Sequence, residues 1–266
     1  MNTISFPELN LELNVSSIAF KVFRVEIHWY AIFICIGIII ALFFLKRRDK
    51  LYNIFWDDIF DLILYVIPVS FVMARLYYVI FKFEDFRYDL LKIFNFRTGG
   101  LAIYGGIIGG IIVTIIYCKI KKINILDMLD YAMPFLALAQ SIGRWGNFVN
   151  IEAYGVASNL PWRMRIESAV GYIDVHPTFL YEAIATFLIF ILLIYLRDKR
   201  RIKGQITYIY LITYSFARFF IEGLRIDSLM LFNFRISQIL SMLIFVVFGG
   251  ILIHKSIILK NKKEII

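Results

Sequence analysis

Seven long apolar runs constrain the fold of this chain more than any other feature of its sequence. They cover roughly Ile27–Leu45, Ile59–Phe81, Gly100–Cys118, Ile125–Ile142, Thr178–Leu196, Gln205–Ile221 and Ile236–Ile253. A helix of about 20 apolar residues is long enough to cross a bilayer. The runs are continuous and do not alternate with a period of two, so they favour helices over a membrane β-barrel. The sequence therefore predicts an all-α integral membrane protein, a bundle of about seven transmembrane helices.

The composition agrees with this class and leaves little room for anything else. Hydrophobic residues make up 61% of the 266 positions, against roughly 45–50% in soluble globular domains. Seven spans use up so much of the chain that we expect a single membrane domain over residues 1–266. Cys35 and Cys118 both fall in or at the end of apolar stretches. Their positions predict no disulfide framework and no metal site.

The basic residues predict the orientation. Four segments on one side of the predicted bundle, Lys46–Lys50, Lys119–Lys122, Arg197–Lys203 and Lys255–Lys263, hold 16 of the 29 Lys and Arg residues. By the positive-inside rule, the C-terminus is cytoplasmic and the N-terminus lies outside. The net charge of +9 is thus spread over loops that orient the protein, which argues against nucleic acid as a partner.

A polar run interrupts the apolar pattern after the fourth span. It extends from Gly143 to Gly155 and reads GRWGNFVNIEAYG. Ionisable groups at membrane depth cost roughly 2.5–3.5 kcal/mol each on insertion scales, so they rarely occur without a partner or a function. A guanidinium suits a phosphate group, amides can orient a headgroup, and a glycine lets the backbone approach closely. We therefore predict an anion site from the following residues: Arg144, Asn147, Asn150, Glu152 and Gly155. The alternative for Arg144 is an interfacial arginine whose charged end reaches the water.

Two further cations lie within predicted spans. Arg218 and Glu222 are four residues apart on the sixth span, so they share one helix face. They form either part of the anion site or a structural ion pair inside the membrane. Arg75 lies within the second span and is interpreted either as a third cation facing the interior or as a snorkelling side chain.

Glycines and aromatic residues complete the set of candidates. The segment from Gly99 to Gly110 is half glycine, and its small-xxx-small spacing is typical of close helix packing. The same segment is open to a second interpretation, in which Gly105 and Gly106 lie against a ligand and Tyr104 presents its hydroxyl. Tyr30, at the start of the first span, is first of all an interfacial anchor. Glu182 points inward one turn into the fifth span.

With these residues assembled, the chain resembles the bacterial prolipoprotein diacylglyceryl transferases. The run Gly143–Gly155 follows that family's signature Gly-Arg-x-Gly-Asn-Phe-x-Asn-x-Glu-x-x-Gly. Four other motifs occur in the family's order. They are His28-Trp29-Tyr30, Tyr104-Gly105-Gly106, His176 through Glu182, and Arg218 through Glu222 to Arg225. Seven spans with an external N-terminus also agree.

The resemblance implies a reaction, its substrates and its place in the cell. The family transfers an sn-1,2-diacylglyceryl group from phosphatidylglycerol to the cysteine thiol of the lipobox in a prolipoprotein signal peptide. A thioether forms and glycerol 1-phosphate leaves, in the first step of lipoprotein maturation. No cofactor is implied. The protein is then expected in the bacterial cytoplasmic membrane, in contact with its lipids, with the active site towards the outer leaflet.

The resemblance also assigns roles. Arg144, Arg218, Glu222 and Tyr104 are expected to be catalytic, with the two arginines clamping the phosphate and Glu222 orienting Arg218. The substrate-binding residues are expected to be Arg144, Asn147, Asn150, Glu152, Gly155, Tyr30, Arg75, Gly105 and Gly106. Many family members have histidine at the position of Tyr104, and a phenol of pKa ≈ 10 is a poor base.

The intramembrane arginines are also compatible with two other classes of function. An anion or lipid transporter also uses intramembrane arginines, but it predicts two related halves with interrupted helices, and the sequence shows no such symmetry. A lipid-binding scaffold without activity would require Arg144, Arg218 and Glu222 all to be structural.

Overall fold

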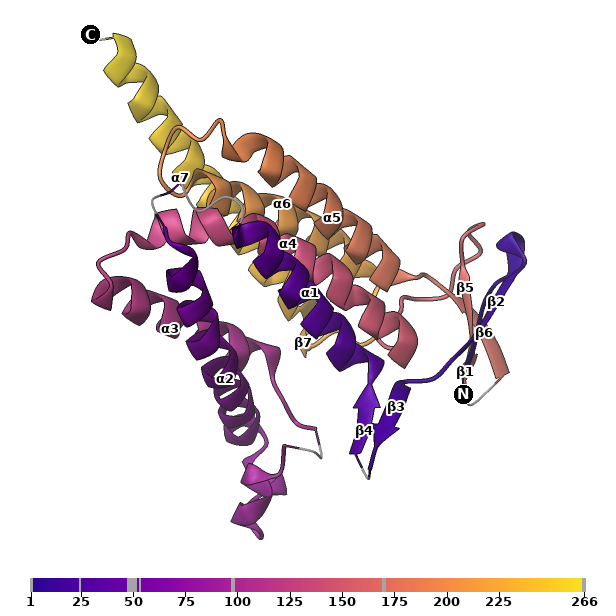
Figure 1. Cartoon of the computed structure of the whole chain (residues 1–266). Helices are drawn as coiled ribbons and strands as arrows, with labels where there is room; N and C mark the ends of the chain where they lie inside the picture. Colours follow the sequence, from indigo (N-terminus) through magenta and orange to yellow (C-terminus); the bar gives the residue numbers. More distant parts are fainter. Residues whose placement is uncertain are drawn as a thin grey trace. The chain divides into compact units, whose positions relative to one another are not determined.

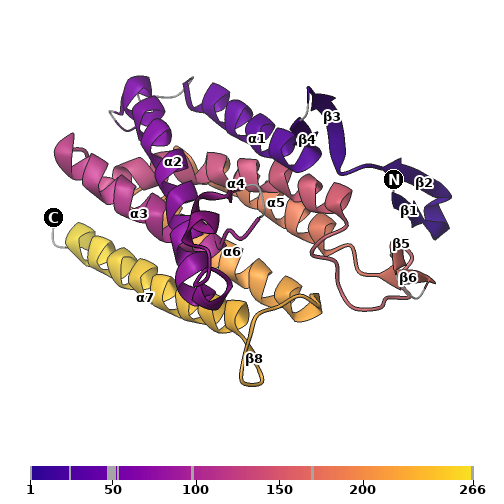
Figure 2. The same ribbon diagram turned by 90° about the horizontal axis from the view of Figure 1, so that it is seen from below.

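The structure is a computed structural model that describes residues 2–23, 25–46, 52, 54–96, 99–168 and 171–264. Parts of the predicted basic loops, Arg24, Arg97 and residues 47–50, lie outside these ranges. The described chain is mostly helical and forms two compact units (Figures 1 and 2). The first unit comprises Met1–Leu45 and Leu129–Ile266, and the second comprises Lys46–Met128.

The first unit holds most of the helices. They are α1 (Trp29–Lys46), α4 (Ile125–Asn150), α5 (Thr178–Arg197), α6 (Gln205–Leu224) and α7 (Ile236–Glu264). Both views show α4, α5 and α6 side by side (Figures 1 and 2). Their shared core contains Ala137 of α4, Ile189 and Leu193 of α5, and Ile206 and Tyr210 of α6. The predicted spans are confirmed as helices, but α4 runs two turns further than the apolar run and includes most of the polar run.

The turn between α5 and α6 is fixed by a carboxylate from α4. Gly204 precedes α6 with φ 87°, in the left-handed region that favours glycine. Asp130 is fully buried and accepts hydrogen bonds from the backbone nitrogens of Gly204 (2.8 Å) and Thr207 (2.8 Å). It also pairs with Arg200 at 2.8 Å. Because the first N–H groups of a helix have no partner within the helix, Asp130 caps α6 from a neighbouring helix.

The second unit is a helix pair. α2 (Trp56–Phe81) packs along α3 (Ile103–Ile120) through the predicted glycine surface. A Cβ atom at Gly105 would collide with the carbonyl of Met73, and one at Gly109 would lie 2.8 Å from the Met73 side chain. The packing interpretation of these glycines is thus confirmed. The segment after α2 contains two short 3-10 helices, η3 (Phe83–Asp85) and η4 (Leu90–Phe94).

Five described helices are long and apolar enough to cross a membrane: α2, α3, α4, α5 and α7. α1 is a shorter apolar helix over Trp29–Leu45. α6 carries Arg218 and Glu222 and lies outside this group of five. The membrane class of the fold is confirmed, whereas the number of spans and their orientation stay predictions.

The expectation of an all-α protein is wrong for the segments between the helices. A four-stranded antiparallel sheet has the order β2-β1-β5-β6 and consists of β1 (Asn2–Phe6), β2 (Leu11–Val15), β5 (Met164–Ser168) and β6 (Gly171–Val175). Two hairpins, β3 (Ile18–Val22) with β4 (Val25–His28) and β7 (Met230–Leu231) with β8 (Phe234–Arg235), precede α1 and α7. The sheet pairs Ile4 with Ile166, so its strands come from distant parts of the sequence. Such pairing leaves no local periodic signal beyond short alternations.

The sheet packs onto the ends of α4 and α5. Ile4 and Ile166 on its inner face meet Phe148 of α4 and Phe179 of α5 in one buried cluster. On the other face, Asp174 binds Arg165 (2.7 Å) and Arg163 (2.8 Å). The hydrogen bond from Arg165 is the main cause that holds the pKa of Asp174 below its usual value. The helix ends that carry the polar run are therefore anchored to an ion-paired sheet.

Candidate functional site

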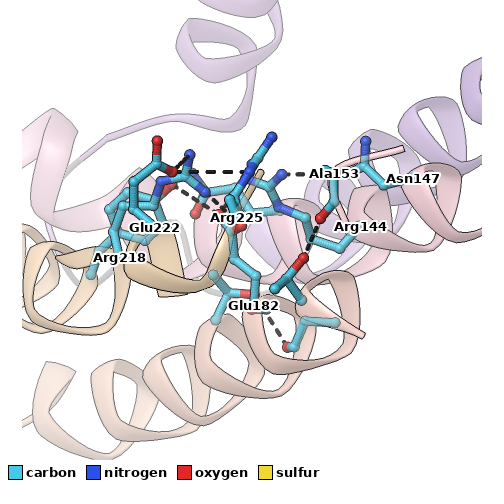
Figure 3. Close-up of polar contacts among 12 residues, drawn as sticks. Arg144, Asn147, Ala153, Glu182, Arg218, Glu222 and Arg225 are labelled. Carbon is cyan, nitrogen blue, oxygen red and sulfur yellow. Dashed lines mark hydrogen bonds and ion pairs between the residues drawn. The ribbon is translucent and has the colours of Figure 1, made fainter. Parts of the chain in front are cut away.

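Two of the predicted arginines meet on one buried carboxylate. Glu182 lies on α5 and is only 3% exposed. Its Oε1 accepts a hydrogen bond from Nη2 of Arg144 on α4, and its Oε2 lies 2.8 Å from Nη1 of Arg218 on α6 (Figure 3). The Tyr214 hydroxyl donates to the same carboxylate at 3.3 Å. Three helices thus bring the two guanidinium groups together around Glu182.

A second carboxylate fixes Arg218 from its own helix. Glu222 is 2% exposed, and its Oε2 lies 2.6 Å from Nη2 of Arg218. The predicted pairing at i, i+4 is confirmed. Arg225 approaches Glu222 at 4.0 Å and forms a two-point contact with Asp227 (2.9 and 2.7 Å). That contact is the main cause that lowers the pKa of Asp227.

The loop after α6 also returns to the site. Arg235 on β8 donates a hydrogen bond to the backbone carbonyl of Glu222. The last carbonyl groups of a helix lack partners within the helix, and a basic side chain there is favourable. Arg235 therefore holds the β7–β8 hairpin to the end of α6 that carries the buried carboxylate.

The polar run folds back on itself at the end of α4. Ile151 donates its N–H to the carbonyl of Phe148 (3.1 Å), and Glu152 donates to that of Asn147 (2.9 Å). These two bonds form the Schellman arrangement that ends many helices, in which the first residue past the helix is left-handed. Glycine usually occupies that position, but here it is Ile151 at φ 53°, and Ala153 follows at φ 56°. Left-handed residues other than glycine cost of order 1–3 kcal/mol and cluster at functional sites.

This turn places Glu152 beside the amides of the same run. Its carboxylate accepts from Asn150 at 2.8 Å and from Asn147 at 3.5 Å. Asn147 in turn accepts from Arg144 at 3.3 Å. Glu152 is predicted to bind substrate, and this stays a prediction. Within the described structure it reaches Arg144 only through Asn147, so the chain of contacts runs from Glu152 through Asn147 to Arg144 and Glu182.

Gly155 and Tyr30 lie next to this network through close packing. Gly155 donates its N–H to the carbonyl of His176 (2.9 Å), and a Cβ there would lie 3.0 Å from the carbonyl of Leu224. The ring of Tyr30 covers Gly146, where an added Cβ would lie 2.5 Å from a ring carbon. Both contacts require glycine for packing. The predicted contact of Gly155 and Tyr30 with substrate stays a prediction.

Arg75 is predicted to bind substrate, which stays a prediction, and the structure shows that it also has a structural role. Its side chain is buried in the second unit, and all of its described hydrogen bonds go to backbone carbonyls. It donates to Lys92 (2.7 Å), Ile93 (2.9 Å), Asn95 (3.0 Å), Gly99 (2.6 Å) and Gly100 (3.0 Å). A guanidinium has five N–H donors and no acceptor. Five carbonyl contacts occupy that capacity, so Arg75 holds the segment between α2 and α3 and has little left for an anion.

The remaining candidates, Tyr104, Gly105 and Gly106, belong to the same unit. Tyr104 is the second residue of α3. Two contacts on either side of Tyr104 hold the start of α3 against α2. Ala102 donates a hydrogen bond from its N–H to the carbonyl of Ala74 (3.1 Å), and Gly105 packs closely against α2. Gly106 makes ordinary contacts with α2, 3.6 Å from the carbonyl of Ser70. The structure thus groups these three with Arg75, while the other candidates form the cluster around Glu182.

The cluster around Glu182 is suited to a polyoxygen anion. Arg144 and Arg218 each use both terminal nitrogens in contacts with the described residues. A guanidinium has five N–H donors, so each of the two groups still has N–H donors available. Their side chains are 21% and 16% exposed, so a ligand can reach them. The buried Oδ1 of Asn150 has no hydrogen-bond partner among the described residues. Buried polar atoms normally have one, and the hydroxyl of a bound molecule would supply it.

Comparison with known proteins identifies the family. The sequence model of the family described as prolipoprotein diacylglyceryl transferase matches residues 17–254. The chain belongs to the prolipoprotein diacylglyceryl transferase family. Proteins named phosphatidylglycerol–prolipoprotein diacylglyceryl transferase resemble it over nearly their whole length. The protein of Finegoldia magna is 44% identical over 94% of this chain and 97% of its own. That of Clostridioides difficile is 45% identical over 93% and 98%, and that of Enterococcus faecalis is 44% identical over 87% of each.

Every predicted site residue lies inside the part of the chain that matches the prolipoprotein diacylglyceryl transferase family. Glu182, Tyr214 and Arg235 belong to the cluster but were missed as site residues. Glu182 carried a signal, because a lone carboxylate inside an apolar span requires a cationic partner. Arg235 carried none, since its partner is a backbone carbonyl supplied by the end of another helix.

Proposed function

We propose that this chain transfers the sn-1,2-diacylglyceryl group of phosphatidylglycerol to the lipobox cysteine of prolipoproteins. The observation that carries the proposal is the pair Arg144 and Arg218 aligned on Glu182, in a chain of this family whose relatives are named for these two substrates. The enzyme acts in the bacterial cytoplasmic membrane, towards the outer leaflet, as the first step of lipoprotein maturation.

The phosphate of the lipid is held by the two guanidinium groups. The four charges of Arg144, Arg218, Glu182 and Glu222 sum to zero, so the site without substrate is neutral and stable inside the membrane. The phosphodiester uses the N–H donors that the carboxylates leave open. The glycerol headgroup is bound by Asn147, Asn150 and Glu152, whose amides and carboxylate match hydroxyl groups.

The reaction is a substitution at carbon. The thiolate sulfur of the lipobox cysteine attacks the glyceryl carbon that carries the phosphate, a C–S bond forms, and the C–O bond breaks with its electron pair on oxygen. Glycerol 1-phosphate leaves as a phosphate monoester and carries more negative charge than the diester did. Donors already oriented at that phosphate stabilise the transition state more than the ground state.

The thiol proton has to be removed before or during the attack. A cysteine thiol of pKa ≈ 8.5 reacts mainly as its thiolate. Tyr104 lies where many family members have histidine, and its hydroxyl is assigned here to hydrogen bonding or relay, because a phenol is a weak base at neutral pH.

The test is a transfer assay with purified protein in vesicles. Labelled diacylglyceryl thioether should appear on a lipobox peptide when the vesicles contain phosphatidylglycerol, and it should not appear with a zwitterionic lipid alone. R144A should abolish transfer, and R144K should restore little because a lysine lacks the two-point fork. R163A removes the same type of side chain from the residue that precedes β5 and should leave transfer near normal. Near-normal transfer by folded R144A would contradict the proposal.

A further inference from the structure

A polar pocket lies between the start of α6 and the C-terminal part of α7. It has a volume of about 330 Å³ and is lined by Arg201, Ile202, Gln205, Ser256, Leu259 and Lys260. Gln205 and Glu222 are seventeen positions apart on α6, which corresponds to roughly 25 Å along a helix axis. The pocket is therefore separate from the cluster around Glu182.

The side chains that line this pocket include two cations, Arg201 and Lys260, and other cations lie nearby. Arg200 pairs with Asp130, and the Lys255 ammonium donates to the hydroxyl of Tyr208 at 2.9 Å. In the part of the chain that the structure describes, the Arg201 guanidinium has no carboxylate within ion-pair distance, and no acidic side chain lines the pocket. Arg201 and Lys260 are both exposed. An anion in the pocket would meet a fork of donors and an ammonium group.

Gln205 adds a donor of fixed orientation. Its amide oxygen accepts from the backbone nitrogens of Arg201 (2.7 Å) and Ile202 (3.4 Å). The NH₂ end of the amide is thus the end that remains for a ligand. Ile202 and Leu259 supply the apolar part of the lining, so the pocket offers donors beside a surface that suits hydrocarbon.

Helix length places this pocket at a membrane boundary. Ser256 lies twenty positions after Ile236, the first residue of α7, or roughly 30 Å along the axis. This distance equals the thickness of the hydrocarbon core, about 30 Å. Ser256 to Lys260 therefore reach the depth of the phosphate groups when α7 spans the bilayer from its first residue.

We propose that this pocket binds the phosphate of an anionic lipid headgroup, at the end of α6 and α7 remote from Arg218. Arg201, Lys260 and the Gln205 amide hold the phosphate, while Ile202 and Leu259 contact the first part of the acyl region. The bound lipid anchors the turn between α5 and α6. No chemical step occurs there, so the pocket is independent of the transfer reaction.

Phosphatidic acid, added to the purified protein in detergent, is the probe, and native mass spectrometry counts the lipids retained. Each basic residue near a membrane surface contributes about 1 kcal/mol to anionic lipid binding, so loss of two cations corresponds to roughly 30-fold weaker binding. The double variant R201Q/K260Q should show that loss at one site per protein. K199Q/K203Q is the matched control, because it removes two charges from the same region without touching the pocket lining, and it should retain the lipid.

Equal retention by R201Q/K260Q and the original protein would overturn the proposal, and so would an equal loss in K199Q/K203Q. Millimolar inorganic phosphate serves as a competitor. Retention of inorganic phosphate with no retention of phosphatidic acid would overturn the assignment to a lipid headgroup and identify the ligand as a free phosphate. Transfer to a lipobox peptide should stay within twofold in both double variants, so the outcome is separate from that of the R144A test.

Discussion

Glu182 connects the two arginines, and its replacement by glutamine is the sharpest test of their arrangement. E182Q keeps the volume of the side chain and one carbonyl oxygen, but it removes the negative charge. The amide oxygen can accept from Arg144 or from Arg218. The NH₂ group then faces the other guanidinium, so one of two charge-assisted hydrogen bonds becomes a donor–donor contact. The two guanidinium groups also lose the charge that screened them from each other.

The magnitude follows from the burial of the three side chains. Glu182 is 4% exposed at its side chain, Arg144 21% and Arg218 16%. Removal of one partner from a buried ion pair costs about 3–5 kcal/mol, and the partial exposure of both arginines favours the lower end. Each 1.36 kcal/mol of transition-state stabilisation is a factor of ten in rate. If about 3 kcal/mol is lost in aligning the phosphate, kcat/KM falls roughly 100-fold.

The assay compares E182Q with E182D in the vesicle transfer reaction, together with thermal unfolding in detergent. E182D keeps the charge on a shorter side chain, so it should recover part of the activity that E182Q loses. That recovery identifies Glu182 as a positioning residue, because a purely steric role would favour the isosteric E182Q. Transfer by E182Q within threefold of normal would refute the reasoning, as would E182Q exceeding E182D.

Three further predictions concern parts of the chain away from the arginine pair. R75K leaves backbone carbonyl groups after α2 without donors, and each unpaired buried carbonyl costs about 1–3 kcal/mol of stability. Hydrogen exchange of the backbone amides in η4 should therefore accelerate. Unchanged exchange would show that the carbonyl contacts are dispensable. The pKa of Asp174 is lower in the folded protein than its ordinary value of 3.8. Its bonds to Arg165 therefore stabilise the sheet fully at pH values above 3.8, and this stabilisation is lost as the pH falls through the lower pKa of the folded state. Proteolysis of β5 and β6 should therefore increase below about pH 4 in the original protein, and D174N should be susceptible already at pH 7. D130N removes the charge that pairs with Arg200 and weakens the cap of α6, which should lower the unfolding temperature while transfer by the remaining folded protein stays near normal.

The helices of this protein could be predicted from sequence, whereas the sheet could not. Every predicted span coincides with a helix, because a continuous apolar run records the thickness of a bilayer directly. β1 and β5 pair through Ile4 and Ile166, and no local pattern reports a partner 162 positions away. The alternation in Met164-Arg165-Ile166 is too short to distinguish a strand from a loop, whereas β2, with the sequence LELNV, alternates over five residues and carries a usable signal.

Several residues of the cluster around Glu182 could be predicted from the sequence, but the contacts between them could not. The spacing of Arg218 and Glu222 on one helix face predicted their contact, since neighbours at i, i+4 need no tertiary information. The contact of Arg144 with Glu182 joins two helices, so it depends on how α4 and α5 pack. The turn at Ile151 was hidden for a different reason. Its left-handed conformation usually indicates glycine, and isoleucine gives no warning of it.

Arg75 and Arg144 differ in the donors that their surroundings leave available for an anion. Both follow apolar residues, and both were assigned to substrate from sequence alone. The five carbonyl contacts of Arg75 use neutral acceptors that belong to one continuous segment. Replacing them with a phosphate would leave several buried carbonyls without donors, each at a cost of about 1–3 kcal/mol.

Arg144 has a different set of partners, a carboxylate and an amide that lie on separate elements. These partners orient the guanidinium through two of its nitrogens and leave donors that a phosphate can take without displacing them. The carboxylate also offsets the charge of the arginine in the absence of lipid. An arginine held by a few charged partners is thus prepared for an anion, whereas one saturated by carbonyls stabilises the backbone. The number and kind of acceptors around each guanidinium therefore distinguish the two roles that we propose for Arg75 and Arg144.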